Sequence, residues 1–120
     1  MITLKLPWPP SVNRYWRHPS RGPLAGRHLI SEDGRKYRVD VMAQVLQAKA
    51  ARELAGSLSV SITAHPPDRR RRDLDNLLKA VLDSLVHAKV IVDDGWIDFL
   101  AIERGEVSAP GYVFVTVKEK

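Results

Sequence analysis

Alternating apolar and polar positions predict four β-strands in this chain. Residues 1–6 alternate, and the prolines that follow end this strand because proline cannot donate to a sheet ladder. The most regular alternation covers 57–64, where serine and threonine separate the aliphatic side chains. Residues 97–102 and 112–118 alternate in the same way, and short runs rich in Asp, Pro and Gly precede them as turns.

Two other segments repeat apolar residues at the spacing of an α-helix. Ser31 is suited to start the first helix, because its hydroxyl can cap free backbone amides, and Gly56 is the predicted stop. The predicted buried stripe of this helix contains Tyr37, Val41, Met42, Val45, Leu46 and Ala48. The second helix is predicted over 76–88. Its predicted buried stripe contains Leu77, Leu78, Val81, Leu82, Leu85 and Val86.

The order of these segments, β-α-β-α-β-β, predicts the fold class. We expect an α/β (α+β) protein with a small mixed β-sheet of about four strands covered by two helices. The length of 120 residues suits a single domain over 1–120 with a modest core. Residues 11–30 are rich in Arg, Gly and Pro and have no period, so they are predicted to form a long basic loop.

The basic charge is concentrated in a few segments, which favours a polyanionic partner. The formal net charge is +5, and Arg14 and Arg17 flank Tyr15-Trp16. Clustered arginines are typical of nucleic-acid binders, so both are candidate DNA contacts. No predicted helix combines a basic face with a bulky apolar face, so a membrane partner is not expected. The chain has no cysteine, no evident signal peptide and no long apolar run, and the expected location is the cytoplasm.

The most informative segment is Asp73-Leu74-Asp75-Asn76, which directly follows the four arginines Arg69 to Arg72. The arginines are suited to bind a polyanion, whereas the two carboxylates would repel it. A divalent cation between carboxylate and phosphate would remove this conflict, and Mg²⁺ or Mn²⁺ prefers such oxygen ligands. The segment therefore indicates metal-dependent cleavage of nucleic acid. The alternative is that the aspartates only neutralise the arginines and cap a helix.

Three further residues extend this candidate site. Lys79 lies one helical turn after Asp75, where it could face a scissile phosphate or form an exposed ion pair. Asn76 could donate to phosphate or complete a helix cap. Asp94 belongs to a second acidic pair, which a turn before Gly95 would also explain. We expect Asp94 to return beside the first pair, since three carboxylates from two segments would hold Mg²⁺.

Three segments resemble the RusA family of Holliday-junction endonucleases, which is found mostly in bacteria and their prophages. They are 6–15 (LPWPPSVNRY), 67–77 (PDRRRRDLDNL) and 91–94 (IVDD), with Ile97 beyond. The central segment is specific, the proline-rich opening supports it, and the spacing between segments also fits. The resemblance covers nearly the whole chain, and it implies the same small mixed α/β sheet.

The resemblance also implies roles for individual residues. Asp73, Asp75 and Asp94 would be the metal-binding catalytic carboxylates, and Lys79 a catalytic basic residue. Arg72 and Asn76 would contact DNA or the active site. The chain departs from the family at Lys89, where a glycine is frequent at the end of the second helix. A missing glycine at this place costs about 1 kcal/mol of capping energy and puts only the local turn in doubt.

The family implies a homodimer that uses Mg²⁺, or Mn²⁺ in its place, on four-way DNA junctions in recombination and repair. A two-fold dimer also has the symmetry of a substrate that must be cut on two strands. Candidate aromatic residues for the dimer interface are Trp8, Tyr15, Trp16, Tyr112 and Phe114. Two other functions stay open: a non-catalytic DNA-binding protein with structural aspartates, and a metal nuclease for other structured DNA or RNA.

Overall fold

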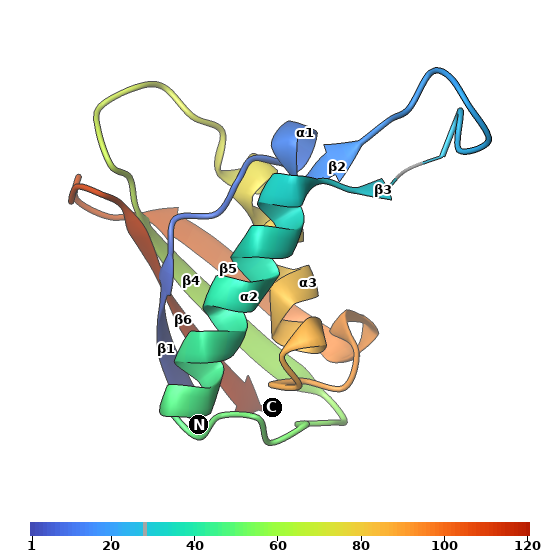
Figure 1. The fold of residues 1–120 in the computed structure, drawn as a ribbon. Helices are drawn as coiled ribbons and strands as arrows, with labels where there is room; N and C mark the ends of the chain where they lie inside the picture. Colours follow the sequence, from blue (N-terminus) through green and yellow to red (C-terminus); the bar gives the residue numbers. More distant parts are fainter. Residues whose placement is uncertain (28) are drawn as a thin grey trace.

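The computed structural model describes residues 1–27 and 29–120, and its centre is one four-stranded sheet (Figure 1). The strand order is β1-β6-β4-β5. The strands are β1 (Ile2–Pro7), β4 (Leu58–His65), β5 (Ile97–Arg104) and β6 (Tyr112–Glu119). β6 runs antiparallel to β1 and to β4, whereas β5 runs parallel to β4 and forms one edge. All four predicted strands are confirmed.

The alternation in the sequence separates the two faces of this sheet. Leu58, Val60 and Ile62 of β4 are buried, and so are Val113 and Val115 of β6. The intervening serine and threonine side chains of β4 project from the other face, where cross-strand neighbours still cover Ser59. The predicted core positions of these strands are therefore confirmed.

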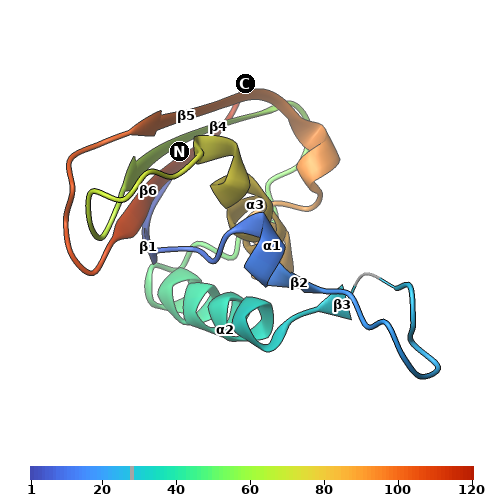
Figure 2. The same ribbon diagram turned by 90° about the horizontal axis from the view of Figure 1, so that it is seen from above.

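Two helices, α2 (Glu32–Gln47) and α3 (Leu78–His87), cover one face of the sheet (Figure 2). Ser31 caps α2, because its hydroxyl accepts a hydrogen bond from the Gly34 amide at 3.0 Å. Tyr37, Val41 and Val45 form the buried stripe of α2. The mixed sheet with two covering helices confirms the predicted fold class.

The predicted end of the first helix is wrong. α2 ends at Gln47 rather than shortly before Gly56, and Lys49 adopts a positive φ of 54°. Leu46 is 63 % exposed and Ala48 is also exposed, so neither belongs to the buried stripe. The helix stops early because the following segment turns back to pair with the chain after α3, through a parallel bridge between Leu54 and Ile91.

Residues 11–30 contain more structure than the predicted loop. A single helical turn, α1 (Val12–Tyr15), leads into the two-stranded sheet formed by β2 (Trp16–Arg17) and β3 (Leu29–Ile30). Tyr15 is fully buried in the core, which removes it from the candidate interface residues. The buried Tyr15 holds α1 against α2 and α3. No periodic sequence pattern in this segment predicts that contact.

Two short 3₁₀ helices frame α3. η1 (Leu74–Leu77) leads directly into it, so helical structure starts slightly before the predicted boundary, and η2 (Asp94–Trp96) precedes β5. Both predicted acidic pairs therefore lie where helical turns begin. Within the described part of the chain, no helix is long and apolar enough to cross a membrane.

Candidate active site and nucleic-acid interface

The arginine-rich segment forms a loop that Arg72 holds in shape. The Arg72 guanidinium lies 2.8 Å from a carboxylate oxygen of Asp68 and donates to the carbonyls of Asp68 and Arg70 at 3.3 and 3.2 Å. It also lies 5.7 Å from the centre of the Trp8 ring. Hydrogen bonds from Arg72 and from the Arg70 amide hold the pKa of Asp68 below its usual range. Asp68 therefore pairs with Arg72 and, at a longer distance, with Arg70, and Arg72 is engaged within the loop.

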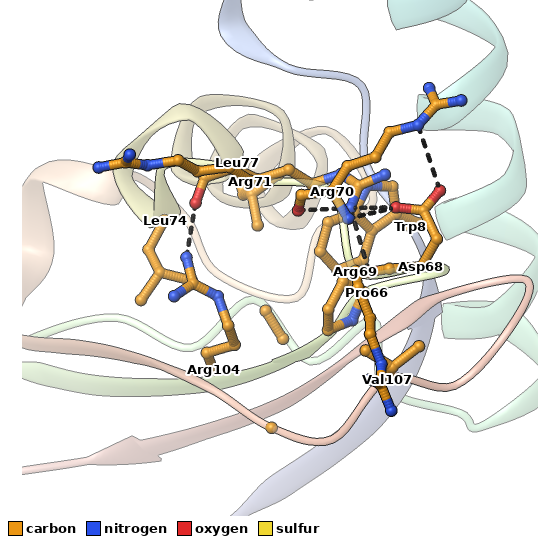
Figure 3. A pocket seen from close by; sticks show the side chains of 13 residues that line it. Trp8, Pro66, Asp68, Arg69, Arg70, Arg71, Leu74, Leu77, Arg104 and Val107 are labelled. Carbon is orange, nitrogen blue, oxygen red and sulfur yellow. Dashed lines mark hydrogen bonds and ion pairs between the residues drawn. The ribbon is translucent and has the colours of Figure 1, made fainter.

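A second arginine fastens this loop to the sheet (Figure 3). Arg104, the last residue of β5, donates to the Arg72 carbonyl at 2.5 Å. Leu74, Leu77 and Arg104 line a cavity of about 310 Å³ beneath the arginine loop. Arg104 was not among the predicted site residues, because nothing in its local sequence indicates a contact with a carbonyl in another segment.

The remaining arginines of the loop face solvent, and Arg70 also keeps an exposed ion pair with Asp68 at 3.9 Å. Arg69, Arg70 and Arg71 are exposed, and Figure 3 shows Arg70 and Arg71 extending away from the cavity in different directions. A larger open cleft of about 770 Å³ lies on the other side of the loop. Its lining includes Arg14, Arg70, Arg71, Arg72, Asp73 and Asn76. The structure thus brings most predicted DNA contacts to one basic cleft, whereas Arg17, on β2, and Arg69, which lines the smaller cavity, lie outside it.

Asp73 and Asp75 are exposed, and their carboxylates make no hydrogen bond or ion pair with the described residues. Asp73 has an extended backbone (φ −85°, ψ 129°) and immediately precedes η1, but it does not cap that helix with its side chain. Asp75 lies inside η1, so these two residues do not belong to one extended strand. Among the described residues, neither carboxylate forms an ion pair with an arginine, whereas Asp68 pairs with Arg72 and Arg70.

Lys79 lies on the first turn of α3, one turn beyond Asp75. Its ammonium group is 5.4 Å from the centre of the Trp16 ring, a distance at which a cation–π attraction operates. Trp16 in turn packs edge-on against Tyr15, with ring centres 5.2 Å apart. The α1–β2 segment therefore sets the position of the lysine.

A polar cluster fastens that segment to α3. The Tyr15 hydroxyl and the Arg38 guanidinium both donate to the carboxylate of Asp83, and Arg38 also donates to the Tyr15 hydroxyl at 2.9 Å. Burial alone would raise the pKa of Asp83, but the hydrogen bonds from Tyr15 and Arg38 outweigh it and lower the pKa. Burial and the hydrogen bond to Asp83 raise the pKa of Tyr15. The cluster joins three distant segments, so sequence reasoning missed it.

Asp94 lies apart from the first acidic pair. It opens η2, where Asp93 accepts a hydrogen bond from the Gly95 amide at 3.2 Å and thereby forms the predicted turn. η1 and η2 adjoin different parts of the fold, since the whole of α3, about 15 Å long, separates them along the chain. Among the described residues, no group of three or more His, Cys, Asp or Glu side chains is placed to hold a metal ion. The expected return of Asp94 beside Asp73 and Asp75 within one chain is therefore not found.

Comparisons with known proteins identify the family of this chain. The family model "Endodeoxyribonuclease RusA" matches residues 7–118. A crossover junction endodeoxyribonuclease of Enterobacteria phage HK97 is 45 % identical over 106 residues, which cover 88 % of this chain and 83 % of the relative. The proteins of the same name from Shigella sonnei strain Ss046 and Escherichia coli strain K12 are 39 % and 38 % identical over 117 residues, covering 98 % of this chain and 93 % of each relative. The chain belongs to the RusA family of endodeoxyribonucleases.

Proposed function

We propose that this chain is a crossover-junction endodeoxyribonuclease that resolves four-way (Holliday) DNA junctions by paired nicking in recombination and repair. The observation that carries the proposal is a pair of carboxylates, Asp73 and Asp75, that form no hydrogen bond or ion pair with the described residues. They lie beside a cleft lined by Arg14, Arg70 and Arg71. Free carboxylates next to a site for polyanions serve no evident structural purpose. The printed names of the relatives support the same activity. Since those relatives come from phage and bacteria, we place the reaction in the bacterial cytoplasm.

The donor set suits Mg²⁺, with Mn²⁺ as a substitute, because all candidate ligands are carboxylate oxygens. Asp73 and Asp75 would supply two of them from one chain, whereas Asp94 lies at the other end of α3. A divalent ion held at such a site activates water and stabilises charge at a phosphodiester. One chain alone therefore supplies an incomplete ligand set.

A homodimer would complete the set of metal ligands. We assign the third carboxylate to Asp94 of a second copy, which would approach Asp73 and Asp75 across a two-fold axis. Two copies then form two identical sites, and their symmetry matches the two strands that must be cut in a four-way junction. The radius of gyration of one chain, 14.6 Å, suits a compact subunit that offers one acidic cluster to each site.

The other residues of the cleft bind and orient the DNA. Arg70 and Arg71 carry exposed guanidinium groups that can pair with phosphates, while Arg72 keeps the loop that presents them in shape. Lys79 lies on the first turn of α3, next to η1, and its ammonium group lies against the Trp16 ring. There it would stabilise negative charge on a scissile phosphate or on the leaving oxygen.

The decisive experiment replaces Asp75 by Asn and measures cleavage and binding separately on a synthetic four-way junction. We expect cleavage with Mg²⁺ to be lost while binding stays equal or becomes tighter, because a negative charge beside the DNA is removed. Glu119→Gln is the matched control, since it removes one negative charge at the opposite end of the sheet and should keep wild-type cleavage.

Three results would contradict the proposal. Loss of folding and binding by Asp75→Asn would make this residue structural. Wild-type binding without Mg²⁺-dependent or Mn²⁺-dependent nicking would indicate a non-catalytic DNA-binding protein. Faster cleavage of duplex DNA or of an RNA hairpin than of the junction would indicate a nuclease with another structured substrate.

A further inference from the structure

Tyr15 and Trp16 are neighbours in the chain, and each contacts a different turn of the same face of α3. Lys79 and Asp83 lie four residues apart on this helix, so their side chains emerge on one face, one turn apart. The Tyr15 hydroxyl donates to the Asp83 carboxylate. The Lys79 ammonium group lies over the Trp16 ring, 5.4 Å from its centre. The dipeptide therefore attaches to α3 at two points.

The Trp16 ring is itself held from several sides. It is partly buried against the core and packs edge-on against Tyr15, with ring centres 5.2 Å apart. Trp16 also pairs with Ile30 in the short sheet of β2 and β3. The amide of Ser31, at the start of α2, donates to the Tyr15 carbonyl at 2.9 Å. These contacts fix the position of the ring relative to α3 independently of the lysine.

Lys79 has few other contacts that could order its ammonium group. The side chain is partly buried, yet it forms no ion pair with a carboxylate of the described residues, and Asp83 attracts it only from a longer distance. A lysine side chain loses rotamer freedom when it is ordered, and attraction to an aromatic ring offsets part of that loss. Among the described residues, the Trp16 ring is the group that this ammonium lies directly against.

The segment that carries Trp16 also borders the candidate DNA cleft. Arg14, on α1, lines that cleft, and α1 packs against η1, which carries Asp75. Lys79 lies on the first turn of α3, directly after η1. A cation that stabilises charge at a scissile phosphate must be held relative to the metal ligands, because a small misplacement loses much of its effect. Trp16 thus connects the lysine to the segment that borders the DNA cleft.

We propose that Trp16 is a positioning residue for Lys79. Its ring holds the ammonium group where the lysine meets the scissile phosphate, and the hydrogen bond from Tyr15 to Asp83 anchors the ring to the same face of α3. The inference rests on the role of Lys79 in the proposed function and adds the residue that fixes this group. Because Trp16 acts through Lys79 and not through a contact with DNA, its removal should slow cleavage without weakening junction binding.

Single-turnover cleavage and binding of a synthetic four-way junction measure these two effects separately. Trp16→Leu should lower the cleavage rate at saturating enzyme about ten- to a hundredfold and leave the Kd for the junction within about twofold of wild type. Trp16→Phe keeps a ring for the ammonium group and should retain most of the rate. Lys5→Met is the matched control and should cleave like wild type, since Lys5 lies over the Tyr112 ring, at 4.3 Å, on β1 and outside the cleft.

A double-variant cycle separates positioning from general packing. In the Lys79→Met background, Trp16→Leu should cause no further loss of cleavage, because the group that the ring holds is already absent. A loss of equal size in both backgrounds would overturn the proposal and make Trp16 a purely structural residue. Weaker junction binding by Trp16→Leu in both backgrounds would also overturn it, since the ring would then contact DNA.

NMR tests the contact without any cleavage. The Trp16 ring should shift the ε-methylene protons of Lys79 upfield relative to those of the exposed Lys36, and this shift should be absent in Trp16→Leu. Tyr15→Phe, which loses the anchor on Asp83, should reduce it. An unshifted Lys79 in the wild type would overturn the proposal even if Trp16→Leu failed to fold. A wild-type protein that shows the shift but cuts no junction would refute the proposed function instead.

Discussion

Asp68 and Asp83 are bound to arginines, whereas the nearby Asp73 and Asp75 face solvent and have no partner among the described residues. This difference separates carboxylates with structural partners from the two that we propose as metal ligands. Asp83 is partly buried, so its charge is stabilised by the two donors that point at it, Tyr15 and Arg38. Removal of a partner would leave the other polar groups of the cluster unsatisfied, which is costlier than the loss of an exposed ion pair.

Asp83→Asn should therefore reduce stability in a pH-dependent way. The pKa of Asp83 is lower in the folded than in the unfolded protein, so its contribution is present above the unfolded pKa of about 3.9 and is lost as pH falls through the folded value. We expect the variant to lose about 1–3 kcal/mol of unfolding free energy near neutral pH. The difference from wild type should shrink in acid. Urea unfolding over a pH series measures both the loss of unfolding free energy near neutral pH and its decrease in acid.

The matched control for this prediction is Asp40→Asn, which changes an exposed carboxylate of α2 that accepts no hydrogen bond within the described part of the chain. It should alter neither the stability near neutral pH nor its dependence on acid. Equal losses for both variants, or a loss for Asp83→Asn that stays constant into acid, would show that the carboxylate charge is not what stabilises the cluster.

At the scale of single residues, the sequence indicated which residues belong to the candidate site better than it indicated which other residues they contact. Asp73 and Asp75 stand out because they follow four arginines, and that adjacency is visible in the sequence. The internal role of Arg72 is not visible, because it depends on Asp68 and Trp8 lying close to its guanidinium group in the folded loop. For the same reason, a linear pattern cannot distinguish Arg72 from the exposed Arg70 and Arg71.

At the scale of elements, long periodic segments were predictable and short ones were not. The four main strands and α3 follow from alternation and helical spacing. α1, β2 and β3 are too short for a period to emerge, and their positions depend on the buried Tyr15. The end of α2 was missed because Lys49, a residue without a left-handed preference, takes the positive φ that glycine usually supplies.

Lys89 is a similar case at the end of α3, and it yields a prediction about stability. It has a φ of 65°, and Val90 donates to the Leu85 carbonyl at 2.9 Å to close the helix. A lysine in the left-handed region is strained, whereas glycine is not. Its ion pair with Glu53, at 3.9 Å, is too exposed to compensate. We expect Lys89→Gly to raise the unfolding free energy by about 0.5–1 kcal/mol in urea titrations.

A control variant should change the unfolding free energy in the opposite direction. Lys36 lies on the exposed face inside α2, where glycine has only an entropic cost, so Lys36→Gly should lose about 1 kcal/mol. If Lys89→Gly destabilises the protein by a comparable amount, the lysine side chain makes a contact that outweighs the backbone strain.

The arginine loop is an element whose role can be measured through salt. Neutralising Arg70 and Arg71 to Gln should weaken binding to all DNA shapes and reduce the slope of log affinity against log salt by about one unit for each lost phosphate contact. Lys118 and Lys120 near the chain end provide the matched double substitution, because they lie at the opposite end of the sheet. An unchanged slope for the arginine variant would mean that these side chains do not touch phosphate.

At the scale of the whole molecule, the path of the chain keeps apart the two acidic segments that the sequence singles out. β4, α3 and β5 form a crossover in which the acidic residues before α3 and after it end up in different places. The sequence indicated both acidic pairs, but their separation depends on the path of the crossover and on the parallel pairing of β4 with β5. A two-fold copy is the simplest arrangement that brings the two pairs together.

Shared sites make a distinctive prediction for mixed dimers. Asp75→Asn and Asp94→Asn should each abolish cleavage alone, because every site of either homodimer lacks one ligand. In an equal mixture, about half of the dimers contain one chain of each kind. One site of such a dimer carries both substitutions, but the other combines the intact Asp75 of one chain with the intact Asp94 of its partner. We therefore expect nicking of a plasmid cruciform to return on mixing, with nicked circles rather than linear DNA as the product.

Mixing Asp75→Asn with Asp73→Asn is the control, since both defects lie in the same half-site and no mixed dimer regains a complete site. If each chain builds its own complete site, the first mixture stays as inactive as the control, and the shared site is refuted while the single-variant assays still report whether the enzyme needs these aspartates.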